Sequence, residues 1–520
     1  MLEANARRDL AALERIDRAA LTPTEQLAYD VFAYKTGQVA EQFDKGLFRV
    51  QQLAPLNPSF GLQVELPDFV SGGGAAFETP ADYERGLARL TGFAGWLNST
   101  VARLRQGRAN GYIQPQIIVR NVLSQVEAML ALPPEESPFH TAIRDMPDSI
   151  SAADRARFQE AYDQVIKDEV YPGYRLWQDY LTDEYLPAAT EAPGRSAIKD
   201  GEDLYAWELA YHTTTPRSAD DIHALGLSEV ARIRAEMETV RDKVAFDGDL
   251  SAMFEYVRSN PEFYYKEPQQ LLDRFASIEA RIWESIPKLF HRWPKAPFRV
   301  APLPALGDQR GTGYYRPGPP DGVTPGTLYF NMSMLDTRPI PTLETLTLHE
   351  GIPGHHFQLT LAIENKDLLD ILRFGRATAY TEGWGLYAES LGPQLGMFTD
   401  PWQYFGHLDM EMLRAVRLVV DTGLHAKQWS RQQAIDYMLA NTSMAEGDVV
   451  VEIDRYIAYP GQACAYKIGE LTIAKLRDEA AQALGDGFDI RDYHAQVLET
   501  GVLPMAVLED KIGRWIAEAA

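Results

Sequence analysis

Histidine and glutamate side chains gather in one short segment beyond the middle of the chain. Three of the ten histidines fall within eight positions, in the run LHEGIPGHHFQ that covers residues 348–358. A helical His-Glu-x-x-His segment places two imidazoles one turn apart on one metal ion, with the glutamate beside them as base for water. His349 and Glu350 begin such a segment, and two histidines follow. The segment predicts a site for metal-dependent hydrolysis.

The spacing of these histidines differs from the usual pattern. His355 and His356 lie six and seven residues beyond His349, about 9 to 10.5 Å along an undistorted helix. That is too far for bonds of about 2.1 Å to one ion. The Pro353-Gly354 pair removes a backbone donor and tolerates unusual dihedral angles, so we expect a locally widened helix there. The alternative is a helix that ends at Ile352, with the histidines as polar residues at a break.

A third ligand is expected from the segment YTEGWGLYAES, residues 380–390. Glu382 and Glu389 lie about two turns apart on one helix face, among aromatic and small residues. Buried carboxylates are unfavourable unless they are paired or bind a metal. We therefore assign Glu382 to the metal and Glu389 to a hydrogen bond that supports a liganding imidazole. Alternatively, one of these glutamates forms an ion pair with an arginine such as Arg373 or Arg376.

Most of the chain resembles the DUF885 family of bacterial proteins. The resemblance is carried by the two segments above and by LAYHTTTPRSADDIHALGLSEV, RLVVDTGLHAKQWSRQQAIDYM and YIAYPGQACAYKIGEL. The family in turn resembles the mostly helical zinc peptidases called gluzincins, which include oligopeptidases, angiotensin-converting enzymes and helical carboxypeptidases. The resemblance implies a deep channel between two helical halves.

The resemblance also implies two histidines and a downstream glutamate as ligands of one zinc ion, with the residue after the first histidine as general base. Zinc also suits mixed imidazole and carboxylate ligands. The ligands are then His349, His355 and Glu382, and the base is Glu350. The longer gap leaves both His355 and His356 as candidates for the second histidine ligand, and His355 is preferred because the Gly-His pair that it completes is similar to the pair that closes the motif in several gluzincin groups. His356 is expected in a supporting role beside the ligands.

Residues in the last third of the chain are expected to complete the site. The spacing of Tyr456 and Tyr459 resembles the tyrosine pair that faces the metal in the converting-enzyme group, so Tyr459, with His425, is expected to stabilise the oxyanion. Polar and cationic side chains would hold the substrate, including a terminal carboxylate. These candidates are His212, Asn331, Arg417, Gln462, Tyr466 and Lys467. Each could instead be a packed or structural residue. The strand with Asn331 is expected to align an extended peptide by edge pairing.

The elements that position these residues are predicted to be mainly α-helical. We expect two helical lobes around a deep channel, an N-terminal lobe of residues 1–200 and a catalytic region of residues 201–520. Thr22-Pro23 and Thr79-Pro80 mark helix starts. Residues 219–243 have the apolar spacing of a helix that buries one face.

A different pattern precedes the histidine-rich segment. Proline and glycine in residues 293–326 predict a long irregular segment. Alternating apolar residues in TLYFNMS, from residue 327, predict a short strand near the active site. A helix is expected to start near Pro341 and to run into His349.

The charge balance excludes several classes of partner. Lys and Arg total 50 against 74 Asp and Glu, a formal net charge of −24. Nucleic acid and anionic membrane surfaces would repel such a chain. No apolar run approaches the roughly 18 residues of a membrane span. The first residues resemble a charged helix and no signal peptide, so we expect a cytoplasmic protein, or an exported one if a leader has been removed.

Together these features predict a zinc-dependent metallopeptidase that hydrolyses short or unstructured peptides, because a deep channel excludes folded proteins. One alternative is a zinc amidohydrolase that acts on small modified amino acids or amides. Another is a metal- or peptide-binding protein without catalysis.

Overall fold

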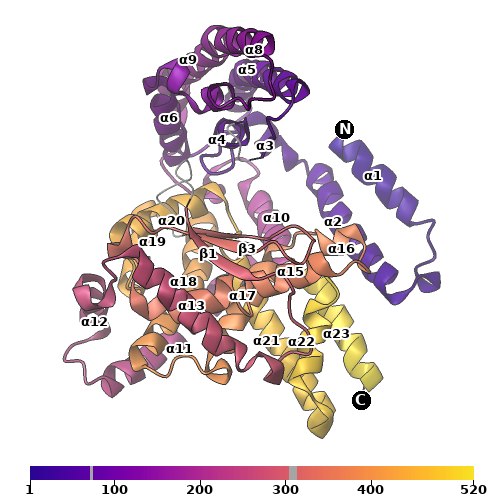
Figure 1. Cartoon of the computed structure of the whole chain (residues 1–520), viewed down its shortest axis with the longest axis vertical. Coiled ribbons are helices and arrows are strands. Elements are labelled where there is room, and N and C mark those ends of the chain that lie inside the picture. The colour runs from indigo at the N-terminus through magenta and orange to yellow at the C-terminus, as the bar shows by residue number, and fades with distance from the viewer. Residues whose placement is uncertain (71–73, 304–312, 520) are drawn as a thin grey trace.

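The computed structural model describes residues 1–70, 74–303 and 313–519 (Figure 1). It is mainly α-helical with a small three-stranded sheet, as the sequence predicts. The helices of the first two hundred residues are α1 (Leu2–Leu13), α2 (Pro23–Asp44), α3 (Phe48–Leu53), α4 (Leu62–Asp68), α5 (Pro80–Ala109), α6 (Gln116–Ala131), α7 (Thr141–Arg144), α8 (Ala152–Val165) and α9 (Tyr171–Tyr180).

The remaining helices form the larger part of the molecule. They are α10 (Gly201–Thr213), α11 (Ala219–Lys243), α12 (Leu250–Ser259), α13 (Pro268–Trp283), α14 (Leu343–Glu350), α15 (His355–Glu364), α16 (Asp370–Arg373), α17 (Thr378–Ser390), α18 (Pro401–Ala426), α19 (Arg431–Asn441), α20 (Glu446–Ala458), α21 (Ala465–Leu484), α22 (Ile490–Leu498) and α23 (Met505–Ala519).

Local sequence signals place several of these helix starts. Thr22 and Thr79 are the N-caps of α2 and α5, and each forms a capping box with the acidic residue three positions later. Proline follows each cap at the first helical position, where its missing N–H is not needed. The predicted helix 219–243 is α11, and its Ile233 and Met237 are fully buried.

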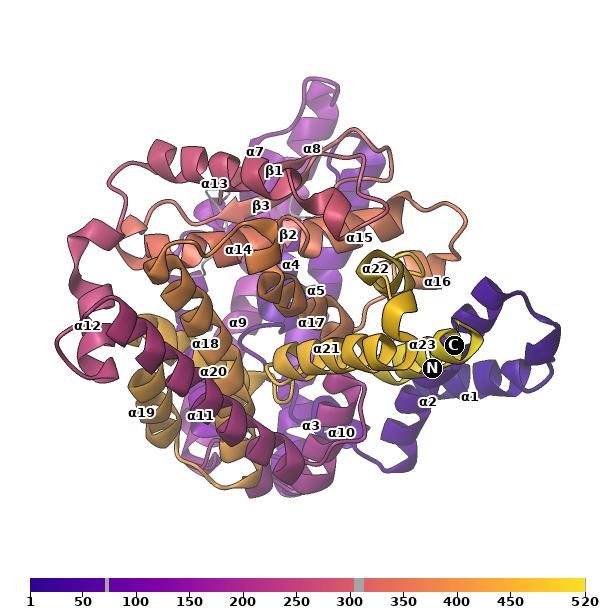
Figure 2. The same cartoon turned by 90° about the horizontal axis from the view of Figure 1, so that it is seen from below.

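The helices α3 to α9 form a group that stands above the rest of the molecule in Figure 1. The helices α1 and α2 do not belong to this group, because α1 packs on α2 and α2 contacts the C-terminal helix α23. In the view from below, the labels of α1, α2 and α23 lie together at one end of the molecule (Figure 2). Leu27 and Val31 of α2 share a buried apolar cluster with Leu508 and Ile512 of α23. The division of the chain at residue 200 stays a prediction.

Two large apolar clusters hold the molecule together. One includes residues of α5, α6 and α9 together with residues of α11, α18, α19 and α20, so it continues from the upper helical group into the larger part. The other surrounds α13, α14, α17, α21 and α22. In the view from below, α17 and α21 lie side by side near the centre (Figure 2). The histidine-rich segment is thus carried on buried elements.

The small sheet lies within and just after the predicted irregular segment. β1 (Phe298–Pro302) pairs in parallel with β3 (Gly326–Phe330), and β2 (Gly313–Arg316) pairs with β3 in antiparallel orientation. The prediction of an irregular segment over 293–326 is therefore wrong where β1 and β2 form, and residues 304–312 lie outside the described residues. The strand predicted from residue 327 is β3.

None of the described helices combines the length and the apolar composition that crossing a membrane requires.

Candidate metal centre

Two helices joined by a short turn replace the widened helix that the sequence suggests. α14 ends at Glu350 and α15 begins at His355. The chain at Gly354 passes so close to α14 that a Cβ atom there would lie 1.9 Å from the carbonyl oxygen of His349. The turn folds α15 back, and the ring centroids of His349 and His355 are 4.6 Å apart. The break in the helix therefore brings the two imidazoles together.

The imidazoles of His349 and His355 and the carboxylate of Glu382 converge. Glu382 Oε2 lies 3.6 Å from His349 Nε2 and 3.3 Å from His355 Nε2. Ligand atoms at about 2.1 Å from a tetrahedral zinc ion are about 3.4 Å apart. These two distances therefore fit a shared ion of that size.

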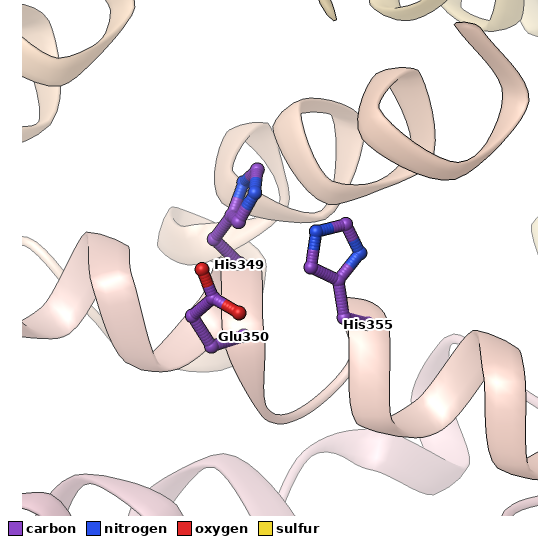
Figure 3. Close-up of side chains that lie close together, drawn as sticks. All are labelled: His349, Glu350 and His355. Atoms are coloured by element: carbon purple, nitrogen blue, oxygen red, sulfur yellow. The ribbon is translucent and has the colours of Figure 1, made fainter. Parts of the chain in front are cut away.

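The carboxylate of Glu350 lies beside His349 and His355. One ligand atom from each of Glu350, His349 and His355 can be chosen so that all three lie within 4.8 Å of one another. Figure 3 shows the Glu350 carboxylate next to the His349 ring, with His355 across the turn. A carboxylate that adjoins the imidazoles can bind the ion as well or accept a proton from water beside it.

The helix α17 arranges most of this cluster. It supplies Glu382, and Gly385 leaves room for the His349 ring, because a Cβ atom there would lie 2.6 Å from His349 Cε1. The Trp384 indole N–H donates a hydrogen bond of 2.8 Å to the carbonyl oxygen of Pro353, which attaches the turn to α17. Gly383 allows the backbone of α17 to touch that of α21.

Glu389, at the end of α17, contacts His349 on the side away from Glu382. Its Oε1 lies 2.8 Å from His349 Nδ1 and accepts a hydrogen bond of 3.1 Å from Arg414 Nη2. The side chain of Glu389 is 1% exposed. A carboxylate bound to Nδ1 fixes the orientation of the ring and directs Nε2 toward the other ligands. The contact between Glu389 and an imidazole is present, and its role toward a metal stays a prediction.

The charges in this cluster shift one another's pKa values. Burial lowers the pKa of His349, but its contacts with Glu382 and Glu389 outweigh burial and raise that pKa to about 9. Burial raises the pKa of Glu382, whereas the charges of His355 and His349 outweigh it and hold that pKa well below its ordinary range. The cluster thus favours an ionised Glu382 carboxylate next to a positively charged His349 imidazole. A metal cation could replace that positive charge.

His356 points away from these residues. Its Nε2 lies 3.1 Å from the carbonyl oxygen of Ala296, and its Nδ1 lies 2.9 Å from the hydroxyl of Tyr315 in β2. Both ring nitrogens therefore attach α15 to the sheet and the segment before it. The structure places His355 at the cluster and gives His356 a packing role instead of the expected position beside the ligands.

Tyr459 and His212 lie together, but away from the histidine and glutamate cluster. They line a cavity of 540 Å³ between α10, the end of α20 and the upper helical group. Their ring centroids are 4.8 Å apart. Among the described residues that line this cavity, none belongs to the histidine and glutamate cluster. The expected role of Tyr459 at the oxyanion is therefore not supported by its position.

His425 has no ring nitrogen available for an oxyanion. Its Nδ1 accepts a hydrogen bond of 3.1 Å from the backbone N–H of Arg195, and its Nε2 lies 3.0 Å from the carbonyl oxygen of Tyr456. The residue is 1% exposed. Burial lowers the pKa of His425 to about 3. The structure thus assigns this neutral histidine to the packing of α18 against its neighbours.

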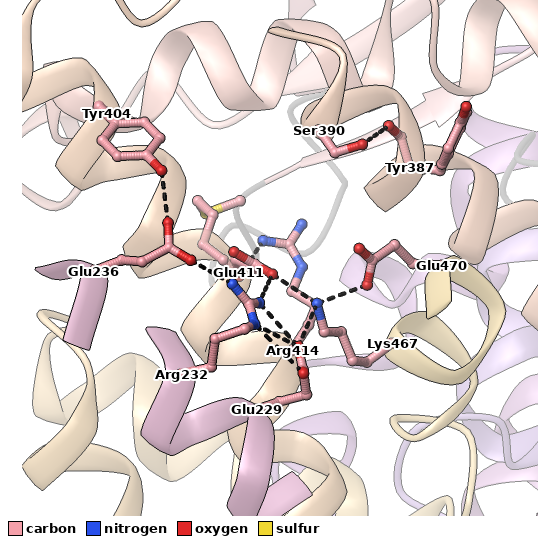
Figure 4. A network of polar contacts seen from close by, with 11 residues as sticks. Glu229, Arg232, Glu236, Tyr387, Ser390, Tyr404, Glu411, Arg414, Lys467 and Glu470 are labelled. Carbon is pink, nitrogen blue, oxygen red and sulfur yellow. Dashed lines mark hydrogen bonds and ion pairs between the residues drawn. The ribbon is translucent and has the colours of Figure 1, made fainter. Parts of the chain in front are cut away.

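Lys467 is enclosed by carboxylates. Its ammonium group lies 2.7 Å from Glu411, 2.7 Å from Glu470 and 3.2 Å from Glu229, and none of its side chain is exposed (Figure 4). This position corrects the expectation that Lys467 meets a substrate carboxylate, because the ammonium group is already surrounded. The other three predicted residues of this region, Arg417, Gln462 and Tyr466, do lie together.

Asn331 follows β3 directly and shapes the turn there. Its Oδ1 accepts hydrogen bonds of 3.0 Å from the backbone N–H and 2.8 Å from the hydroxyl of Ser333. β3 is the central strand, with β1 on one side and β2 on the other. Edge pairing of a peptide with this strand is therefore excluded, because both of its edges are occupied.

Three further residues position the cluster although the sequence did not single them out, namely Trp384, Gly385 and Arg414. Gly385 gave the clearest signal, since a glycine within a helix that also carries the candidate ligands indicates a close approach by another group. Arg414 lies three residues before Arg417, and that spacing places both on one face of α18.

The protein thus combines a mainly helical fold with a cluster of two buried histidines and two partly buried glutamates. The chain belongs to the DUF885 family, described as bacterial proteins of unknown function, whose model matches residues 2–512. No curated protein matches the sequence.

Two solved structures are similar over almost the whole chain. A candidate lipoprotein from Colwellia psychrerythraea has a TM-score of 0.89 and 28% identity, with 99% of this chain and 90% of that chain covered. A candidate lipoprotein of unknown function from Shewanella oneidensis has a TM-score of 0.74 and 18% identity, with 98% of this chain and 91% of that chain covered. The second likeness concerns the fold alone.

Proposed function

We propose that this protein is a zinc-dependent hydrolase that cleaves peptide bonds in short peptides. The observation that carries the proposal is the convergence of His349 Nε2, His355 Nε2 and Glu382 Oε2, with the carboxylate of Glu350 beside them. The resemblance to helical zinc peptidases supports the same assignment of ligands and base.

The residues present fit a zinc ion. Two imidazoles and a carboxylate are ligands that zinc accepts in hydrolytic sites. Glu389 supplies the hydrogen bond to the far nitrogen of His349 that liganding histidines usually have. When bound, zinc acts as a Lewis acid toward a carbonyl group and makes water more acidic.

Glu350 is the residue to which we assign proton transfer. Its carboxylate would accept the proton of the attacking water and return it to the nitrogen of the leaving amine. The oxygen of the attacked carbonyl group gains negative charge and also needs hydrogen-bond donors. We assign none of these donors to His425, whose ring nitrogens both have backbone partners.

Burial of the cluster supports short substrates. The side chains of His349, His355 and Glu382 are 4%, 10% and 20% exposed. A folded protein surface could not reach such a site, whereas an extended peptide could. Because the similar structure from Colwellia psychrerythraea, at 28% identity, is described as a candidate lipoprotein, we also propose that the protein works in an exported compartment.

The test compares the wild type with Glu350→Gln after both have been loaded with zinc. We expect the wild type to hydrolyse a panel of short peptides faster than small N-acyl amides, measured as kcat/KM for each. Glu350→Gln should retain zinc by elemental analysis and lose most of the turnover, because glutamine cannot accept the proton. Glu446→Gln, at an exposed position in the first turn of α20, is the matched control and should behave as the wild type.

Two results would refute the proposal. One is a zinc-loaded wild type that hydrolyses no member of the panel. The other is undiminished turnover in Glu350→Gln. A marked preference for the small amides would instead favour an amidohydrolase.

A further inference from the structure

A second buried polar cluster lies near the candidate metal centre, around Arg417. Arg414 and Arg417 are three residues apart on α18 and therefore project from the same helix face, with Cβ atoms roughly 5 to 6 Å apart. Arg414 binds Glu389, which in turn contacts His349. Arg417 is therefore on the helix face that also carries Arg414, the partner of Glu389.

The cluster around Arg417 has more positive than negative groups. Arg417 donates hydrogen bonds of 2.8 Å from Nε to the hydroxyl of Tyr456 and 2.8 Å from Nη2 to Glu452. Arg455 binds the same carboxylate at 2.9 Å and also donates to Gln462. Two guanidinium groups thus share one carboxylate, so the cluster can take up one further negative charge.

One donor of this cluster has no acceptor among the described residues. Arg417 Nη1 is buried and has no hydrogen-bond partner among those residues, and the whole Arg417 side chain is only 9% exposed. A buried charged donor without a partner is unfavourable, so such a group usually has an acceptor in the functional state.

Tyr466 connects this cluster to the metal cluster. The guanidinium carbon of Arg417 lies 4.5 Å from the centre of the Tyr466 ring. Tyr466 is one helical turn before Gly469, whose backbone touches Gly383, the residue after Glu382. Burial raises the pKa of the Tyr466 hydroxyl, and the charge of Glu382 raises it further. Tyr466 therefore lies between the guanidinium of Arg417 and the candidate ligand.

Both clusters can be reached from solvent. The side chains of Glu452 and Arg455 are 20% and 25% exposed, and that of Glu382 is 20% exposed. Each cluster therefore has at least one side chain that borders solvent.

We infer that Arg417 binds the C-terminal carboxylate of the peptide substrate, so that the enzyme removes residues from the C-terminal end. This inference rests on the proposed function. A guanidinium with a free N–H group is well suited to a carboxylate, and every unmodified peptide has one at its end.

The test uses matched N-acetylated tripeptides of alanine and phenylalanine, each as the free acid and as the C-terminal amide. The zinc-loaded wild type should hydrolyse the free acid roughly 10- to 100-fold faster in kcat/KM, the range expected for one hydrogen bond to a charged group. A third set carries a glutamate side chain and a C-terminal amide. This set shows whether a side-chain carboxylate can replace the terminal one.

Arg417→Met should reduce the ratio of free-acid to amide turnover to about one, while slow hydrolysis of the amide remains. Arg417→Lys retains the positive charge but cannot bind Tyr456, Glu452 and the substrate carboxylate at the same time. It should keep part of the preference for the free acid, even if Arg417→Met folds poorly. Arg431→Met is the matched control, since Arg431 also forms an ion pair with α20, through Asp454, and lies outside both clusters. Its ratio should equal that of the wild type.

A binding measurement gives a readout that does not depend on turnover. Zinc-loaded Glu350→Gln should bind the free acid more tightly than the amide by calorimetry, and the double variant with Arg417→Met should lose that difference. Equal turnover and equal binding of acid and amide would overturn the inference and leave the proposed hydrolysis intact. Preference for the glutamate-containing amide over the free acid would also overturn it. Absence of all turnover would refute the proposed function, and the binding difference would still decide the role of Arg417.

Discussion

Replacing Glu389 by glutamine tests whether this residue orients a metal ligand. Glutamine has the same shape and can still accept the hydrogen bond from His349 Nδ1, which is 2.8 Å away. It lacks the negative charge, which favours the ring orientation and balances Arg414. Loss of such a partner of a liganding histidine lowers metal affinity by about 10- to 100-fold. The corresponding change in binding free energy is about 1.4 to 2.7 kcal/mol.

The assay is a competition titration of zinc between the protein and a chromophoric chelator. Glu382→Gln should weaken zinc binding more than Glu389→Gln, because it alters a proposed ligand. Glu344→Gln is the matched control: this glutamate is also buried and paired with arginines, but it does not contact an imidazole of the cluster. Its affinity for zinc should match that of the wild type, even if the unfolding temperature falls. An affinity of Glu389→Gln within about threefold of the wild type would refute this reasoning.

Three further predictions concern other parts of the structure. Gly385→Ala would place a methyl group within 2.6 to 3.0 Å of the His349 ring, so zinc affinity should fall at least about tenfold; Gly95→Ala, with open space at the added carbon, should leave it unchanged in the same titration. Because the pKa of His349 is about 9 without a metal, zinc binding at pH 7 should release about one proton, and zinc affinity should rise with pH up to about pH 9. Calorimetry in two buffers with different heats of ionisation measures the released proton. A binding enthalpy that does not depend on the buffer would contradict the assignment of His349 as a ligand. Burial lowers the pKa of Lys511 to about 7, below its unfolded value of about 10.4, so the unfolded state binds more protons between these values and stability should rise by about 2 kcal/mol from pH 7 to pH 9. Urea unfolding should show this rise for the wild type and for the exposed control Lys475→Met, but not for Lys511→Met.

The helices and the identity of the clustered residues could be predicted from the sequence. Thr22 and Thr79 are followed by proline and an acidic residue, and this local signal is enough to start α2 and α5. Histidine and glutamate are so seldom buried without partners that their presence in apolar segments indicated a shared site. The strand β3 was also expected, but its central position was not, because β1 and β2 carry no strong local pattern.

Tertiary contacts decide what the sequence could not show. The break between α14 and α15 depends on the contact of Gly354 with the His349 carbonyl oxygen and on the hydrogen bond from Trp384, which come from packing. Tyr459 lies just beyond the end of α20, where the chain turns, so helical spacing from Tyr456 did not predict its direction. Lys467 lies on a face of α21 that meets Glu411 and Glu229, and both glutamates are far from Lys467 along the sequence.

The two histidines belong to separate helices, α14 and α15, and the nearby glutamate belongs to a third, α17. An ion held by all three would therefore act as a cross-link that the unfolded chain lacks, and ligands that bind the native state alone raise its stability. A sample with incomplete metal content should then melt as two populations, the loaded one at the higher temperature, in proportions that follow its zinc content. Purification in the presence of chelators would yield mainly the metal-free protein, which is the less stable population.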